Sequence, residues 1–151
     1  MSAHTRLTAM VLALTIMLAP ASAAEAQRSS KPPRDPVQIQ QKLQRSASLQ
    51  RQALQTLNDP EQAEQLVKNA WTELRSAQDD MVINASNMQF PDPLFSANNR
   101  RAEQALALLL GCWDTLKLRD KWTDPNSQIA GVRGRLQQSL GLTNTVAATT
   151  F

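Results

Sequence analysis

Few side chains in this chain of 151 residues could take part in chemistry, and the single cysteine is the first to consider. Cys112 lies in the stretch ALLLGCWDTLKLRDKW, residues 107–122. Together with Ala105 it forms a row of small residues at seven-residue spacing, which favours a packing role, because a buried free cysteine behaves as a small hydrophobic residue. Burial would also raise the pKa of its thiol and leave it inert. The alternatives are a reactive thiol, an intermolecular disulfide and metal ligation.

The remaining groups give no recognisable catalytic arrangement. His4 is the only histidine, and it lies in a segment that we expect to be removed, so the processed protein would lack the commonest general base and zinc ligand. Asp79 and Asp80 are adjacent and diverge by about 100° on a helix, which prevents them from sharing a substrate. A carboxylate di-iron site needs Glu-x-x-His, and no Ser/His/Asp triad, phosphate-binding loop or dinucleotide motif occurs. The sequence therefore predicts no catalytic residue, no metal ligand and no cofactor.

The first 26 residues have the features of a secretory signal peptide. MSAHTR carries a basic residue, LTAMVLALTIMLA is apolar but short for a membrane span, and PASAAEA supplies small residues. Of two A-x-A cleavage sites, at residues 21–23 and 24–26, we prefer the second, which gives a mature start at Gln27. The alternative is an uncleaved membrane anchor. We expect a bacterial protein that is periplasmic or secreted.

Residues 27–36 read as a flexible, proline-rich basic spacer. From here to Arg51 the chain has one acid, Asp35, against six basic residues: Arg28, Lys31, Arg34, Lys42, Arg45 and Arg51. This N-terminal arm is either simply solvated or makes peripheral contact with an anionic membrane surface or an acidic partner. Nucleic acid is not expected as a partner, because the chain has no tyrosine and no interleaved basic and aromatic residues.

Helical periodicity begins after the spacer. Residues 37–57 place Ile39, Leu43, Leu54 and Leu57 on one side, but Ser46 and Gln50 interrupt this stripe, so we expect looser packing here.

A second helix is predicted over residues 60–88, with Asp59 as its cap and Pro60 in its first turn. It carries a large row at seven-residue spacing, Val67, Leu74, Met81 and Met88, beside a small row, Ala63, Ala70 and Ala77. A large row beside a small row allows a partner helix to approach closely.

A third helix, about residues 96–121, repeats this pattern, with Asp92 or Ser96 as its cap. One of its rows is Ala102, Leu109 and Leu116, and the next is Ala105 and Cys112. A fourth starts with Asp124 and Pro125 and ends at Gly141, which leaves residues 142–151 as a loose tail. We expect the core of the second and third helices to contain Ala70, Leu74, Ala77, Met81, Ala105, Leu109, Cys112, Trp113 and Leu116.

The fold class predicted is all-α: a small antiparallel bundle of about four helices over residues 37–141, built on a central hairpin of the second and third helices. The alternative is an elongated hairpin that buries its remaining apolar stripes by forming a homodimer.

The connection FPDPLF is the candidate partner-binding surface, with Phe90, Pro91, Pro93, Leu94 and Phe95. Rigid apolar groups make effective anchors, although the same side chains could instead fold back and cap the core. The C-terminal TVAATTF either forms a disordered tail or offers a carboxylate for capture. We therefore expect a non-enzymatic envelope protein that acts through protein–protein interaction, as an adaptor or chaperone-like factor. The alternatives are a bundle that binds a small apolar ligand or lipid, and a carboxylate-based hydrolase.

Overall fold

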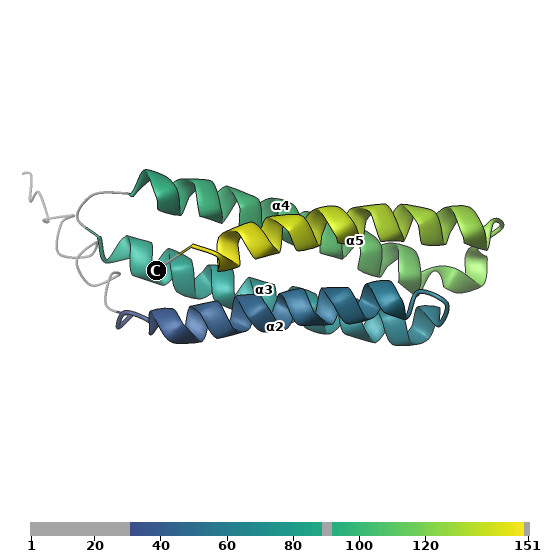
Figure 1. Ribbon diagram of the computed structural model, residues 1–151, viewed down its shortest axis with the longest axis horizontal. Coiled ribbons are helices and arrows are strands. Elements are labelled where there is room, and N and C mark those ends of the chain that lie inside the picture. The colour runs from purple at the N-terminus through teal and green to yellow at the C-terminus, as the bar shows by residue number, and fades with distance from the viewer. Residues whose placement is uncertain (1–30, 89–91, 150–151) are drawn as a thin grey trace, which may run out of the picture. The chain divides into compact units, whose positions relative to one another are not determined.

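The computed structural model describes residues 31–88 and 92–149, which contain four α-helices, one short 3-10 helix and no strand. The helices are α2 (Pro36–Gln55), α3 (Pro60–Ser86), α4 (Pro93–Lys117) and α5 (Pro125–Ala147), with the 3-10 helix η1 (Arg119–Lys121) between the last two (Figure 1). The all-α prediction is confirmed. The predicted signal peptide, residues 27–30 of the spacer, Phe90 and Pro91 lie outside the described residues.

An Asp-Pro dipeptide marks the start of each of these four α-helices, with the proline as the first helical residue. The aspartate precedes the helix and its side chain accepts a hydrogen bond from a backbone N–H of the first turn, at 2.9 to 3.2 Å. The proline follows at a position where its missing N–H costs nothing. The predicted caps Asp59 and Asp124 are confirmed, and Asp92 rather than Ser96 caps α4, which therefore starts at Pro93.

The four helices share one core. Helix α2 packs against α3 and α5, and α4 packs against α3 and α5, so the helices close into a ring. Figure 1 shows that successive helices run in opposite directions. The second and third predicted helices, α3 and α4, do pack on each other. Helix α2 with α3 and helix α4 with α5 pack at least as extensively as this pair, and the contact between α2 and α5 is the smallest of the four.

The seven-residue rows of α3 and α4 supply the middle of this core. The large row of α3 is buried from Val67 to Met81, but Met88 lies beyond the end of the helix and is 52% exposed. The small row of α3 and both rows of α4 are buried, as their spacing predicted: Ala63, Ala70, Ala77, Ala102, Ala105, Leu109, Cys112 and Leu116.

The polar interruptions in α2 do not loosen its packing, contrary to expectation. Ser46 and Gln50 are both completely buried. The Ser46 hydroxyl donates to the carbonyl oxygen of Ala70 on α3 at 2.8 Å, and Nε2 of Gln50 donates to the hydroxyl of Thr143 on α5 at 3.0 Å. Burial of the Ser46 hydroxyl and the Gln50 amide nitrogen is tolerated because both find partners on neighbouring helices, whereas Oε1 of Gln50 has none among the described residues.

The prediction that the chain loosens after Gly141 is wrong. Helix α5 continues to Ala147, and Thr143 and Val146 are buried in the core. Gly141 does not adopt a positive φ, so it has no helix-ending conformation and behaves as an ordinary helical residue. The residues beyond Thr149 lie outside the described part of the chain.

The described end of the spacer, residues 31–35, is held against the last turns of α3 rather than free. The amide side chain of Asn84 accepts from the backbone N–H of Arg34 at 2.6 Å and donates to its carbonyl at 2.9 Å. Asn87 adds a hydrogen bond to the carbonyl of Lys31 at 3.3 Å. Among the helices described, none combines the length and apolar character that crossing a membrane requires.

Candidate functional site

Cys112 lies in the α4–α5 seam and is completely buried. Its Sγ is 3.6 Å from the carbonyl oxygen of Val132, to which the thiol donates a weak hydrogen bond. Burial raises the pKa of the Cys112 thiol to about 11, although the charge of Arg135 lowers it in part. A thiol in this state is protonated at neutral pH and is a poor nucleophile.

At pH 8 native Cys112 should react with a thiol reagent at least about 100-fold more slowly than it does in denaturant, because both its burial and its raised pKa suppress the thiolate. Since the folded pKa exceeds the unfolded one, this thiol should reduce stability as pH rises above about 8.5. Cys112→Ala should fold with a loss of about 1 kcal/mol or less and should remove that alkaline component. Rapid labelling of the native protein would contradict a packing role.

The carboxylates considered for catalysis are occupied by ion pairs. Asp80 is nearly buried and contacts the amino group of Lys42 and, at 3.5 Å, Nε of Arg34. Asp79 is exposed and pairs with Arg75 at 3.3 Å, so the two adjacent acids do point apart. Within residues 31–88 and 92–149 no three metal-ligating side chains come together.

Trp113 is half-buried and packs against the core, whereas the other predicted core residues of α3 and α4 are buried. Its ring centroid is 6.2 Å from that of Trp71, and Nζ of Lys117 lies 4.3 Å from the Trp113 centroid. A lysine over the Trp113 indole ring adds a cation–π contact at the outer edge of the α3–α4 contact.

The predicted binding segment is divided by the structure. Pro93, Leu94 and Phe95 form the first turn of α4 rather than a loop. Leu94 is 48% exposed, whereas Phe95 packs against the core. Both line a small pocket of about 200 Å³ at the end of the helices. Phe95 therefore has the position of a core cap.

A larger hollow, which the sequence did not reveal, lies between α4 and α5. It is an open groove of about 910 Å³. Its surface is mainly apolar and comes from Ala107, Leu108, Gly111, Gly141 and Leu142, and its polar residues are Gln104, Arg135, Gln137 and Gln138. We call this hollow the α4–α5 groove.

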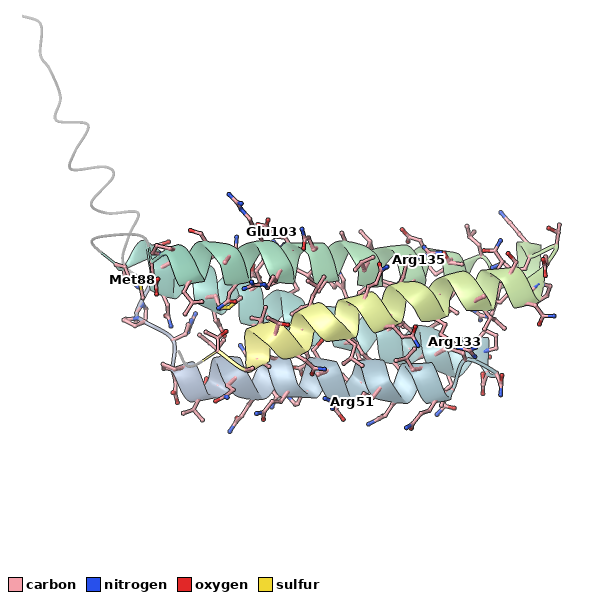
Figure 2. All side chains as sticks on the ribbon, turned by 45° about the horizontal axis from the view of Figure 1, so that its top comes forward. Arg51, Met88, Glu103, Arg133 and Arg135 are labelled. Atoms are coloured by element: carbon pink, nitrogen blue, oxygen red, sulfur yellow. The ribbon has the colours of Figure 1, made fainter. Side chains whose placement is uncertain are left out.

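Among the described residues, Arg135 is the one charged residue that lines the groove. It reaches from α5 to α4, where Nη1 donates to the carbonyl oxygen of Gly111 at 3.0 Å, while its Nε donates to the carbonyl of Gly131 at 3.3 Å. A Cβ at residue 111 would lie 3.2 Å from Nη1, so a glycine there gives the guanidinium room to rest against α4. Figure 2 shows Arg135 on the α4 side of α5.

The guanidinium is held in place but is not neutralised. Helix α5 contains no acidic residue, and no ion pair of the described residues involves Arg135. Arginine has five N–H donors, and the two hydrogen bonds to backbone carbonyls leave the others for an incoming group. The α4–α5 groove thus combines an apolar floor with a fixed positive charge, an arrangement suited to a ligand with an apolar body and an acidic edge.

Comparisons of the chain with protein-family models, with curated proteins and with solved structures find no match. Small helical folds host many unrelated functions, so function here has to be argued from the groove and from the distribution of charge.

Proposed function

We propose that this protein is an exported, non-enzymatic helical bundle that acts in the cell envelope by binding a partner protein in the α4–α5 groove. The observation that carries the proposal is the open apolar floor with Arg135 fixed beside it. Export rests on the signal-like N-terminal segment of the sequence.

The partner that best fits this groove is an amphipathic helix. Its apolar residues would cover Leu108 and Leu142, and a carboxylate on its edge would pair with Arg135. Recognition of a helix in an apolar groove is a common mode of peptide binding, and a charge at the edge of the groove fixes the register of the partner. The glutamines at residues 104, 137 and 138 can complete the rim with hydrogen bonds.

A non-enzymatic role is favoured by the condition of the groups that could react. The one thiol is buried and protonated at neutral pH. The carboxylates of Asp80 and Glu73 form ion pairs with Lys42 and Arg45 of α2. A carboxylate held in an ion pair is less able to take up a proton beside a substrate, as a hydrolase requires.

Site-specific photo-crosslinking in the producing cells tests the proposal. A crosslinking residue in place of Gln138, at the groove, should capture a discrete protein, whereas the same residue in place of the exposed Gln65 on α3 should not. Arg135→Glu should reduce the capture by about tenfold, because it places like charges together. Arg75→Glu, the same charge reversal on α3, should leave it unchanged. Equal capture from both crosslinking positions would refute the groove as the binding surface.

The apolar floor of the groove also favours a second candidate, a small apolar ligand or lipid. Native mass spectrometry of protein purified without detergent distinguishes the two, because a bound lipid would add a defined mass. Arg135→Glu should then lower the fraction of protein that carries this added mass. A doubled mass would instead indicate a homodimer.

A further inference from the structure

Charge is segregated among the helices. Helices α2 and α5 contain basic residues and no acid, whereas every carboxylate inside an α-helix of the described chain lies on α3 or α4. Because α2 packs against α5, the two helices without acids are neighbours. The basic residues of this pair are Lys42, Arg45, Arg51, Arg133 and Arg135.

Ion pairs within the fold divide these basic residues into two groups. Lys42 and Arg45 lie on the side of α2 that meets α3, where they pair with Asp80 and Glu73. Arg34, also from the basic N-terminal arm, pairs with Asp80 as well, so three basic residues of the arm are engaged in ion pairs with α3.

Arg51 and Arg133 remain on the outer surface. Both are exposed, and neither takes part in an ion pair of the described residues. Arg51 donates to the side-chain oxygen of Asn144 on α5 at 3.2 Å, so α2 and α5 are joined there by uncharged and basic groups only. Figure 2 shows Arg51 and Arg133 on the α2 side of α5, away from Arg135 and the groove. We call this surface the α2–α5 face.

The α2–α5 face offers charge but little apolar anchorage. The large hydrophobic side chains exposed in the described chain are Val82, Met88, Leu94, Leu110 and Leu118, around α3 and α4, with Val37 alone in the first turn of α2. Protein interfaces rely on buried apolar anchors at their centre, which this face lacks. A layer of anionic lipid headgroups needs no such anchors, because it attracts basic residues over a wide surface.

We propose that the α2–α5 face binds the surface of an anionic phospholipid bilayer. Arg51 and Arg133 contact lipid phosphates, and the amide and hydroxyl side chains between them donate further hydrogen bonds to the headgroups. Binding is peripheral and electrostatic, with no insertion of the helices. It leaves the α4–α5 groove, on the other side of α5, to its partner and does not depend on that partner.

Vesicle co-flotation, at low salt, of the intact protein recovered after export tests this inference. The protein should float with vesicles of equal parts phosphatidylglycerol and phosphatidylcholine, remain unbound with phosphatidylcholine alone, and detach at high salt. Each basic residue near such a surface contributes about a fivefold gain in binding, so Arg51→Gln with Arg133→Gln should weaken binding about 25-fold.

The matched control is Arg75→Gln with Arg100→Gln, which removes the same charge from exposed positions of α3 and α4. It should leave flotation nearly unchanged, and circular dichroism melts should show that both double variants remain folded. Equal losses in the two variants, equal binding to neutral vesicles, or no binding to anionic vesicles would each overturn the inference. Because both variants retain Arg135, crosslinking at Gln138 should persist in them, which separates this result from a failure of the groove proposal.

Discussion

Replacing Ala70 with leucine is expected to lower the free energy of unfolding by about 3 kcal/mol. Ala70 is completely buried on α3, and the Ser46 hydroxyl of α2 donates to its carbonyl oxygen at 2.8 Å. A side chain of α2 therefore touches the backbone of α3 at this residue. A leucine would force the helices apart and would also displace the Ser46 hydrogen bond, so the costs of overpacking and of an unpaired buried polar group add. Urea unfolding followed by circular dichroism measures the loss.

Asn69→Leu is the matched control, because the neighbouring residue is exposed on the same helix. Leucine is a good helix former, so this variant should stay within about 0.5 kcal/mol of the parent. If Ala70→Leu were no more destabilising than Asn69→Leu, the close approach of α2 and α3 would be refuted.

The starts of the helices could be predicted from sequence because their signals are local. Asp59 with Pro60, and Asp124 with Pro125, define a helix start through a few neighbouring residues without help from the rest of the fold. The rows of α3 and α4 could be predicted for a similar reason, since seven-residue spacing places residues such as Leu74 and Met81 on one side of a helix wherever that helix packs.

The extent and polarity of the core could not be predicted in the same way. Glycine at residue 141 is an ordinary stop signal, but α5 continues past it to Ala147 because Thr143 and Val146 find buried sites in the core. Ser46 and Gln50 break the apolar stripe of α2, and only the carbonyl of Ala70 and the hydroxyl of Thr143 allow them to be buried. Both outcomes depend on partners far away in sequence.

The α4–α5 groove was missed because no single segment encodes it. Gly111 and Arg135 are unremarkable in their own helices, and the site exists because packing places the guanidinium on the carbonyl of Gly111. The spacing of small residues at 107 and 111 is the one signal that could have indicated a hollow on α4.

Gln50→Glu is expected to destabilise the fold by about 4 kcal/mol at neutral pH. Nε2 of Gln50 donates to the hydroxyls of Ser46 and Thr143, at 3.2 and 3.0 Å, while these hydroxyls donate onward to the carbonyls of Ala70 and Ser139. A carboxylate at residue 50 would face the hydroxyl oxygens of Ser46 and Thr143, whose protons are already donated to backbone carbonyls. It would be completely buried with no basic partner.

The same variant should show a characteristic dependence on pH. Burial without a counter-charge raises the pKa of a carboxyl group in the folded state above its unfolded value of about 4.3. The unfolded chain therefore ionises first, and the variant loses stability as pH rises above about 4.3. Relative to the parent protein, Gln50→Glu should be nearly as stable at pH 4 and much less stable at pH 7. Thermal or urea unfolding of both proteins across this range measures the difference.

Gln50→Met separates the effect of charge from that of packing. Methionine is unbranched and of similar size, and it removes Oε1, which has no hydrogen-bond partner among the described residues. The Ser46 and Thr143 hydroxyls keep the carbonyl oxygens to which they donate, so no buried donor is left unpaired. Stability should therefore remain within about 1 kcal/mol of the parent at all pH values. A loss as large as that of Gln50→Glu, and independent of pH, would mean that the amide itself holds α2 to α5.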